Sequence, residues 1–374
     1  MIIETIEVFG VAVPLVGAFS TSYQSTSEQR SAIVRLVASD GTVGLGNVDP
    51  VPGYSEETTE ATLDAIAHRL APVVLGTDPR NLHRLLALMD RTLPRHFDAK
   101  AAIEMACCDL SARAQRVSVA TLLGGAVRDT VRFNAWIGIV PPGRAADEAA
   151  GWKARGFASA KVKVGHDVDA DVERLRAIRE ATGPHWQIRI DANAGYDADT
   201  AIALARRVEP LGLELFEQPV PADDIAGLAR VRRACPFLPI MADESVTDHA
   251  SLLAVLRADA ADLVKVKPMK QGGLLTTRRL LATAEAAGVR CVLGHGFGLG
   301  VNTLAEIMLG ASAPNVIDGL ECVGPLKTAD DIVRHKLDLG SGSLEVPAGP
   351  GLGAELDPDR IERYRFFHHR GAIA

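Results

Sequence analysis

A repeated unit of one short apolar strand and one amphipathic helix fills most of this chain after about residue 131. The predicted strands are RFNAWIGI, SAKVKV, QIRID, LELFE, PIMAD, LVKVK, RCVLG and VIDGLE. Their ends recur at intervals of roughly 26 residues, which is the length of one βα unit. About eight such units in sequence close into a parallel barrel more readily than they extend as an open sheet. We therefore expect an α/β fold built on a closed barrel.

An open, doubly wound sheet is the alternative architecture, and it would usually carry a nucleotide-binding loop. No GxGxxG segment follows a predicted strand, and GHGFGLG at 294–300 precedes a helix without the lysine of a phosphate-binding loop. The sequence therefore favours the barrel and gives little support to nucleotide binding.

The first 125 residues follow a different pattern. Strand-like alternation in IIETIEVFGVAVPL and SAIVRLVASDGTVGLGNV, with a turn at Asp40-Gly41, precedes a run of helical segments. From about Asp330 the βα repeat stops, and we expect the tail to return to the first region. The predicted domains are therefore an α+β capping domain at 1–125, the barrel at 126–328 and a segment at 329–374 that completes the capping domain.

Composition and charge exclude several classes of partner. Of the 374 residues 47% are hydrophobic and 23% are charged, and the net charge is −7 without a basic stripe, so neither nucleic acid nor an anionic membrane is an expected partner. No apolar run reaches the roughly 18 residues of a spanning helix, and no basic segment precedes the first apolar stretch, so we expect a cytoplasmic protein. The five cysteines form neither a disulfide framework nor a CxxC metal clamp, and we expect buried free thiols.

Three successive predicted strands end in a carboxylate: Asp191 in QIRID, Glu217 in LELFE and Asp243 in PIMAD. The carboxyl ends of parallel strands meet at one mouth of a barrel, so these acids should lie together. Because like charges so close repel strongly, we expect a cation among them. Oxygen ligands with room for water and substrate favour Mg²⁺ or Mn²⁺ over zinc. Helix capping is the structural alternative, and it explains one such acid better than three at a common interval.

Lysines stand on both sides of these acids in the sequence. Lys161 and Lys163 are two residues apart, so both point to the same face of their strand. Across the barrel, LVKVKPMKQGG supplies Lys265, Lys267 and Lys270, and the spacing does not choose between the last two as the functional group. A lysine partly desolvated beside a divalent cation has a lowered pKa and can accept a proton. Solvated side chains at strand ends are the simpler alternative for any single lysine.

This predicted arrangement fits removal of a proton from the carbon next to a carboxylate. That proton is so weakly acidic that the resulting enediolate needs strong stabilisation, which a divalent cation on both carboxylate oxygens provides. Phosphoryl transfer fits less well, because no glycine-rich phosphate loop precedes the acids. A barrel that binds a carboxylate metabolite without turnover is a further alternative, which exchange of the substrate α-proton in D₂O would exclude.

Several segments resemble the enolase superfamily and, within it, the muconate lactonizing enzyme subgroup, also described as mandelate racemase/muconate lactonizing proteins. They are AAIEMACCDLSARAQRVSVATLLGG in the first region and KVKVG, DANAGY, FEQPV, ADES and KPMKQGG in the barrel. The resemblance covers nearly the whole chain. It implies a TIM-type (β/α)7β barrel with an N-terminal α+β capping domain completed by the C-terminal segment.

The same resemblance implies an isomerase that depends on Mg²⁺ or Mn²⁺ and acts on a small carboxylate. The reaction would be racemisation, epimerisation or a muconate-type cycloisomerisation, and we expect a homo-oligomer. A dehydratase acting on a β-hydroxy carboxylate such as a hydroxyproline is the alternative, because the same intermediate can expel a β-hydroxyl.

Individual roles also follow from the resemblance. Asp191, Glu217 and Asp243 are implied to be the metal ligands, and Lys163 and Lys270 the acid/base pair. Substrate contacts are implied for Tyr23 in the covering loop at 18–26, Tyr54, Lys161, Asn193, His295 and Glu321. Asn193, Glu244 and Lys267 are implied to support the ligands from behind.

Some positions depart from particular members of the family. The eighth strand reads LECVGP, with Glu321, which is similar to muconate lactonizing enzymes and unlike the Asp-x-Asp of dipeptide epimerases. Gly298 stands where muconate enzymes tend to have a glutamate, which argues against muconate itself. His295 is either a substrate contact or a packed histidine at a strand end. Lys270 takes the strand on which the mandelate group carries its His-Asp base.

Overall fold

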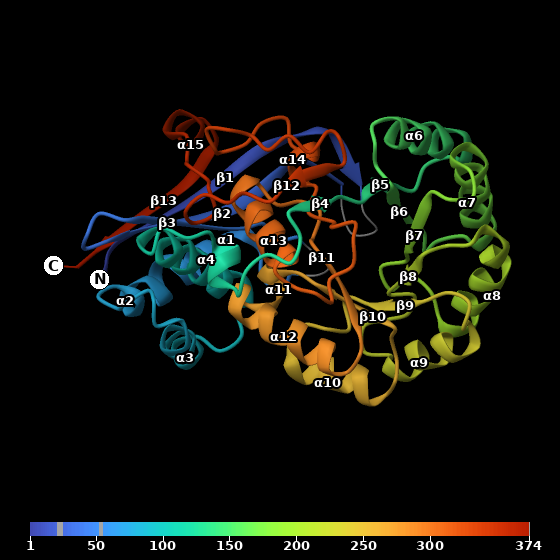
Figure 1. Ribbon diagram of the computed structural model, residues 1–374, viewed down its shortest axis with the longest axis horizontal. Coiled ribbons are helices and arrows are strands. Elements are labelled where there is room, and N and C mark those ends of the chain that lie inside the picture. The colour runs from blue at the N-terminus through green and yellow to red at the C-terminus, as the bar shows by residue number, and fades with distance from the viewer. Residues whose placement is uncertain (21–24, 52–54, 374) are drawn as a thin grey trace.

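The computed structural model describes residues 1–20, 25–51 and 55–373, and two regions are visible in it (Figure 1). The first contains a four-stranded antiparallel sheet in the order β13-β1-β2-β3. Its strands are β1 (Ile3–Ser20), β2 (Ser25–Ala38), β3 (Val43–Val48) and, from the far end of the chain, β13 (Arg365–Ala372). The predicted turn at Asp40-Gly41 connects β2 to β3. The C-terminal end of the chain thus pairs with β1, while the division at 125 and 328 stays a prediction.

Helices cover this sheet and separate it from the second region (Figure 1). They are α1 (Thr59–Asp64), the π-helical η1 (Ala65–Leu70), α2 (Ala71–Val74), α3 (Leu82–Thr92), α4 (Phe97–Ala114) and α5 (Val119–Leu122). Residues of α4 are buried on all sides, as expected for a helix covered both by the sheet and by other helices. Its Glu104 accepts hydrogen bonds from the backbone N–H groups of Leu274 (2.7 Å) and Leu275 (2.8 Å), so α4 joins the two regions.

Seven parallel strands form the sheet of the second region, in the order β11-β10-β9-β8-β7-β6-β5. They are β5 (Ala135–Ile137), β6 (Ser159–Lys163), β7 (Gln187–Asp191), β8 (Leu215–Glu217), β9 (Ile240–Ala242), β10 (Leu263–Val266) and β11 (Arg290–Leu293). The helices between and after them are α6 (Pro142–Ala154), α7 (Val168–Thr182), α8 (Ala198–Val208), the 3₁₀ turn η2 (Glu209–Leu211), α9 (Ile225–Ala234), α10 (His249–Arg257), α11 (Pro268–Gln271), α12 (Leu274–Ala286) and α13 (Gly300–Ala311). This alternation agrees with the predicted βα repeat.

The segment 316–320 connects the two outer strands of this sheet. Val316 forms a parallel bridge with Cys291 of β11, and Leu320 forms one with Phe133, just before β5. The N–H of Asn134 donates to the carbonyl of Leu320 at 2.8 Å. The curled sheet and these bridges fit a barrel-type α/β fold with an N-terminal capping region, and not the open sheet considered as the alternative.

The rest of the chain runs along both regions. It contains the small antiparallel pair β4 (Thr130–Arg132) and β12 (Ser343–Glu345), and the helices α14 (Gly324–Lys327) and α15 (Pro358–Tyr364). All five cysteines are buried free thiols, as predicted. In the part of the chain that the structure describes, no helix has the length and apolar character needed to cross a bilayer.

The interior of the barrel is apolar at one level and charged at the next. Leu215, Met241, Leu263 and Val292 form a small buried cluster of their own. Two residues further along three of these strands, the same inward face carries Glu217, Asp243 and Lys265, because side chains of a strand alternate between faces. The charged level therefore lies toward the carboxyl ends of the strands, where the sequence placed the site.

Close packing of α4 on β3 leads to a testable prediction. A Cβ atom on Gly46 would lie 1.9 Å from the carbonyl oxygen of Ala102, and neither backbone can move away without disturbing the sheet. Gly46→Ala should therefore lower the free energy of unfolding by about 1–3 kcal/mol or more. Gly151→Ala is the matched control in α6, where a Cβ meets nothing within 4 Å. It should stabilise by about 0.4–1 kcal/mol. Equal melting temperatures for the two variants would contradict this packing.

Candidate active site

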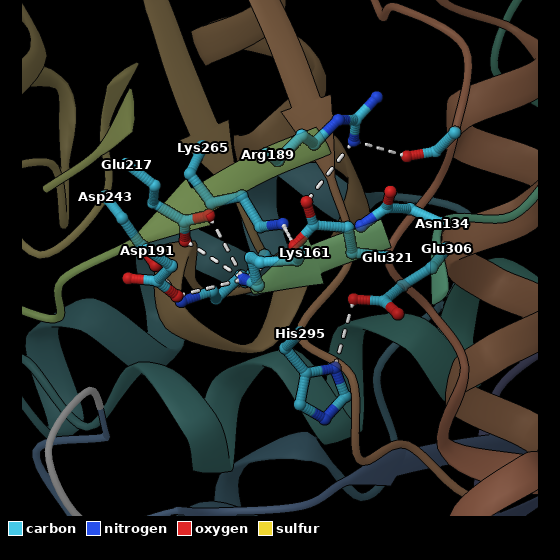
Figure 2. A network of polar contacts seen from close by, with 12 residues as sticks. Asn134, Lys161, Arg189, Asp191, Glu217, Asp243, Lys265, His295, Glu306 and Glu321 are labelled. Atoms are coloured by element: carbon cyan, nitrogen blue, oxygen red, sulfur yellow. Dashed lines mark hydrogen bonds and ion pairs between the residues drawn. The ribbon is translucent and has the colours of Figure 1, made fainter. Parts of the chain in front are cut away.

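The carboxyl ends of three neighbouring strands bring the predicted residues into one row. Lys163, Asp191 and Glu217 are the last residues of β6, β7 and β8. They are aligned in register, Lys163 beside Asp191 and Asp191 beside Glu217. Asp243 follows β9 directly, and the three acids are at most 1% exposed. Figure 2 shows the three acids side by side at this end of the barrel.

Lysines of β6 contact two of these acids. The Nζ atom of Lys161 lies 3.2 Å from Oδ2 of Asp191 and 3.1 Å from Oε2 of Glu217, so both carboxylates share one ammonium group (Figure 2). Lys163 Nζ lies 2.7 Å from Oδ2 of Asp191. Lys161 and Lys163 lie on the same face of β6 because strand side chains alternate, and both therefore contact Asp191.

A second pair of lysines reaches the third acid from beyond β10. Lys267 donates to Oδ2 of Asp243 at 2.5 Å, and Lys270 donates to Oδ1 at 2.7 Å and to the backbone carbonyl at 2.6 Å. The sequence left open whether the functional lysine, at the end of this strand, is Lys267 or Lys270; β10 ends at Val266, and Lys270 lies in α11. Lys267 and Lys270 therefore both contact Asp243, Lys267 from the position directly after β10 and Lys270 from α11.

The donor chemistry of this row fits a hard divalent cation. It offers carboxylate oxygens from adjacent strand ends, and Asp191 and Glu217 already converge on one cationic atom, Lys161 Nζ. Within the described residues, no three acidic, histidine or cysteine side chains converge closely enough to hold a metal ion as they stand. Ammonium groups occupy the positions around the carboxylates, so a metal ion would replace lysine contacts there.

Burial and neighbouring charge shift the protonation of these groups. Burial, together with repulsion from Asp191, raises the pKa of Glu217 to about 8. Burial alone would raise the pKa of Asp243, but Lys267 and Lys270 outweigh it and hold that pKa well below its ordinary value. Burial lowers the pKa of Lys270 despite the attraction of Asp243. The Glu217 carboxyl is thus shifted toward its protonated form although Lys161 Nζ lies 3.1 Å away, and the Lys270 amine is shifted toward the form that accepts a proton.

Asn193 and Glu244 form hydrogen bonds beside the row, and their supporting role stays a prediction. The amide of Asn193 donates to Oε1 of Glu244 at 3.0 Å, and the N–H of Asn193 donates to Oδ1 of Asp191 at 2.9 Å. Lys163 in turn donates to the Asn193 side-chain oxygen. The Asn193 backbone has a φ of 43°, a left-handed conformation that asparagine tolerates better than most residues. Asn193 therefore contacts both Lys163, a predicted acid/base group, and Asp191, a predicted metal ligand.

Glu321 is held by three cations from inside the barrel. Its Oε2 lies 2.7 Å from Lys161 Nζ, its Oε1 lies 3.3 Å from Arg189 Nη1, and Lys265 also donates to it (Figure 2). These cations outweigh the effect of burial and hold the pKa of Glu321 well below its ordinary value. Arg189 was not predicted, although its position two residues before Asp191 places it on the same inward face.

His295 lies where the barrel meets the capping region. Its Nδ1 is 3.2 Å from Oε1 of Glu306 in α13, and its Nε2 is 3.7 Å from Oδ2 of Asp49, which follows β3. All three side chains are fully buried. His295 is therefore packed between two acids, and its proposed substrate contact stays a prediction.

A cavity opens beside these groups. Its lining includes the following predicted site residues: Lys161, Lys163, Asp191, Asn193, Asp243, Lys267, His295 and Glu321. Of the predicted residues that the structure describes, Glu217, Glu244 and Lys270 are not part of this lining. Tyr23 and Tyr54 lie outside the described residues, as does part of the loop at 18–26.

The buried Asp49 leads to a prediction about pH. Burial raises its pKa to about 6, although the charge of His295 and hydrogen bonds from Ser31 and Asn47 oppose this shift. Because an unfolded aspartate titrates near pH ~3.9, the native state binds the proton more tightly, and ionised Asp49 costs stability above pH ~6. That cost disappears as the pH falls toward about 4.

Asp49→Asn should therefore raise the melting temperature, relative to the parent protein, more at pH 8 than at pH 4.5. Differential scanning calorimetry at the two pH values measures this difference. Asp223→Asn, at an exposed position, is the matched control and should show a smaller pH effect. A melting-temperature difference for Asp49→Asn that is the same at both pH values would contradict the burial argument.

Both regions of the chain match protein-family models. Residues 3–124 match the N-terminal domain of the mandelate racemase/muconate lactonizing enzyme family. Residues 144–360 match the enolase C-terminal domain-like model. The two matches together cover most of the chain, and they fall on the capping region and on the barrel.

Relatives of known activity match over nearly their full length. N-succinyl-L-Arg/Lys racemase from Bacillus cereus is 33% identical over 369 residues, which are 98% of this chain and 99% of that protein. Chloromuconate cycloisomerase from Cupriavidus necator is 34% identical over 368 residues, which are 97% of this chain and 99% of that protein.

Solved structures also match this fold over nearly the whole chain. The crystal structure of the Bacillus cereus racemase superposes with a TM-score of 0.95 at 31% identity, covering 99% of this chain and 100% of that one. A dipeptide epimerase from Cytophaga hutchinsonii, in complex with Mg and the dipeptide D-Ala-L-Val, superposes with a TM-score of 0.92 at 27% identity, again over 99% and 100%. Proteins that share this fold and sequence pattern therefore include a racemase, an epimerase and a cycloisomerase.

Proposed function

The chain belongs to the mandelate racemase/muconate lactonizing enzyme family of the enolase superfamily and is an isomerase, and we propose that Lys163 and Lys270 exchange the α-proton of its small carboxylate substrate. The observation that carries this proposal is the position of two lysine pairs around one row of buried acids. Lys163 reaches Asp191 from β6, and Lys270 reaches Asp243 from α11. Amines on two sides of one row can act on opposite faces of one carbon.

Asp191, Glu217 and Asp243 are proposed to hold the metal ion, which is Mg²⁺ or, as the alternative, Mn²⁺. The Mg in the related dipeptide epimerase supports a divalent cation. When bound, such an ion stabilises the negative charge that develops on the substrate carboxylate as the α-proton leaves. The convergence of Asp191 and Glu217 on one cationic atom, Lys161 Nζ, supports this assignment.

The chain's own residues then have distinct tasks. One of Lys163 and Lys270 takes the α-proton, and the other returns a proton to the opposite face. The lowered pKa of Lys270 favours the neutral amine that this step requires. Lys161 is proposed to pair with the substrate carboxylate. Asn193 is proposed to hold Lys163 in line with Asp191.

Further residues are proposed to support these groups or to enclose the substrate. Glu244 and Lys267 would orient Asn193 and Asp243 through the hydrogen bonds described above. Tyr23 and Tyr54 would close over the cavity together with the loop at 18–26. His295 and Glu321 would border the substrate from the cavity wall.

The contacts of Glu321 narrow the substrate class. Three cations already surround this carboxylate, so a substrate ammonium group would compete with Lys161, Lys265 and Arg189 for it. We therefore favour a carboxylate without a free α-ammonium group, such as an N-acylated amino acid or a muconate-like acid. Dehydration of a β-hydroxy carboxylate is not favoured, because the relatives that match over their full length are isomerases.

The finer architecture is part of the same proposal. We infer a (β/α)7β barrel in which the segment 316–321 takes the place of the eighth strand, supported by its bridges to β11 and to the residues before β5. The pairing of β13 with β1 supports a capping domain at 1–125 that is completed by 329–374, with the barrel at 126–328. A homo-oligomer is proposed as the assembly.

The lysine pair is tested by proton exchange. In D₂O with Mg²⁺, the parent protein should exchange the α-proton of at least one member of a panel of N-succinyl amino acids, proline derivatives and muconates, as measured by ¹H NMR. Lys163→Ala and Lys270→Ala should each reduce racemisation or cycloisomerisation by about 10²–10⁴-fold. If the product is a racemate, each variant should still exchange the enantiomer whose proton faces the remaining lysine.

Controls separate chemistry from folding. Lys153→Ala in α6, whose Nζ donates to the carbonyl of Thr182, is the matched lysine variant and should keep activity. Circular dichroism should show that both active-site variants fold. Substantial residual turnover in both Lys163→Ala and Lys270→Ala would defeat the assignment.

A further inference from the structure

Glu104 of α4 is a buried carboxylate that has no part in the chemistry described so far. Its side chain lies in the capping region and is fully buried. Its Oε2 accepts the N–H of Leu274 at 2.7 Å, and its Oε1 accepts the N–H of Leu275 at 2.8 Å. Burial raises the pKa of Glu104, although these two hydrogen bonds oppose the shift. Because a buried carboxylate without donors is costly, the contact requires a defined position of both partners.

The two N–H groups belong to the first turn of α12, which its own side chains do not cap. The first N–H groups of a helix have no partner within it, and a serine, threonine, aspartate or asparagine before the helix often accepts one. Gly273 takes that place, with a φ of 125° that favours glycine. A Cβ atom on Gly273 would lie 2.5 Å from Oε2 of Glu104. The start of α12 is therefore capped by a residue of the other region.

The start of α12 is connected directly to a lysine of the candidate site. Residues 272–273 separate α12 from α11, the short helix that contains Lys270. A backbone hydrogen bond closes this connection, because the N–H of Gly273 donates to the carbonyl of Pro268 at 2.8 Å. Lys270 reaches Oδ1 of Asp243 at 2.7 Å. A displacement at the start of α12 would therefore move α11 and the amine of Lys270 with it.

The capping region also encloses α11 itself. α11 lies next to α4 (Figure 1), and its Met269 is buried in the apolar core that β1, β2 and α4 form. A Cβ atom on Gly272 would lie 3.2 Å from the ring of Phe97, the first residue of α4. Lys163 is held differently, since its backbone carbonyl accepts a hydrogen bond from Arg174 of α7 at 3.1 Å. One lysine is thus placed by the barrel and the other by the capping region.

We propose that Glu104 is a positioning residue for proton transfer: through the start of α12 it places the amine of Lys270, so the capping region controls exchange on one face of the substrate. This inference rests on the proposed function, in which Lys163 and Lys270 act on opposite faces of one carbon. Glu104 is not part of the cavity lining and touches no substrate. Its effect should therefore be confined to the face that Lys270 serves.

The variant Glu104→Gln keeps the shape of the side chain but turns an amide donor toward one of the two N–H groups. Exchange of the α-proton in D₂O with Mg²⁺ is followed by ¹H NMR for both enantiomers of each N-succinyl amino acid in the panel. The enantiomer that Lys163→Ala still exchanges is the one that Lys270 serves. Its exchange should slow by about tenfold or more, because misplacing a reacting group by about 1 Å can cost about 100-fold in rate.

The other enantiomer should exchange at nearly the parent rate, because Lys163 does not depend on α11. If only a muconate reacts, the two α-protons of its lactone product replace the two enantiomers in this comparison. Gly273→Ala disturbs the same contact from its other partner, because its Cβ would meet Oε2 of Glu104. It should show the same selective loss, and it replaces Glu104→Gln if that variant is unfolded.

Asp109→Asn is the matched control. Asp109 lies in the same helix, is also fully buried and accepts two backbone N–H groups, that of Leu45 at 2.8 Å and that of Leu352 at 2.7 Å. Thermal unfolding should show a loss of stability for Asp109→Asn as well as for Glu104→Gln. Only Glu104→Gln should slow one enantiomer more than the other, because the partners of Asp109 do not connect to α11.

Lysine reactivity gives a second measurement, which needs no substrate. Lys270 is only 4% exposed, so acetic anhydride should modify it slowly in the parent protein, and peptide mass spectrometry measures this for each lysine. In Glu104→Gln the modification of Lys270 should be several times faster. Lys153 of α6, which is exposed, should react at the same rate in both proteins.

The outcomes separate this inference from the function on which it rests. Equal slowing of both enantiomers, or unchanged exchange of both, would refute the inference and assign Glu104 a purely structural role, while proton exchange by the two lysines would stand. If the parent protein exchanges no α-proton in the panel, the proposed function fails. The reactivity of Lys270 then decides alone, and an unchanged rate in Glu104→Gln would refute the placement of this amine by Glu104.

Discussion

Opposite charges buried together at the carboxyl ends of the strands are the interaction on which this structure depends. Asp191, Glu217 and Asp243 would each cost several kcal/mol in an apolar interior if they were ionised alone. Lys161 Nζ lies within 3.2 Å of the first two, and Lys267 and Lys270 donate to the third. Two of the lysines that contact these acids, Lys163 and Lys270, are also those proposed to exchange the substrate proton. If a metal ion bound these acids, the lysine amines would no longer pair with them and could exchange a proton with the substrate.

The capping region and the barrel are connected by buried polar contacts and not by apolar packing alone. Glu104 in α4 accepts two backbone N–H groups at the start of α12, and Asp49 approaches His295. Such contacts require a defined position of each partner, because a buried polar group left without one is costly. They therefore fix how the capping region sits over the mouth of the barrel. The cavity is lined by Val51 of the capping region and by Lys161 of the barrel, so its shape depends on how the two regions are placed.

Much of the barrel and its row of acids was predictable, because the signals are local. A charged residue at the end of an apolar strand, repeated at a constant interval, predicts a common mouth, and strand register then places Lys163 beside Asp191. The position of Lys270 beside Asp243 could not be inferred in this way, because Lys270 lies in α11, where strand alternation no longer applies. The neighbours of His295 were also hidden, since Asp49 comes from a distant part of the chain and no local pattern connects the two.

Contacts of Arg189 hold the segment that follows α13. This segment bridges the two outer strands of the barrel sheet and carries Glu321. The Arg189 guanidinium donates to the backbone carbonyls of Asp318 and Gly319 at 2.7 Å each and also contacts Glu321. A Cβ on Gly319 would lie 2.7 Å from Arg189 Nη2, so this approach requires glycine. The segment is thereby fixed from the barrel interior up to Glu321, at the same level as the acids. Glu321, which lines the cavity, is therefore held at a defined position by the contacts of Arg189.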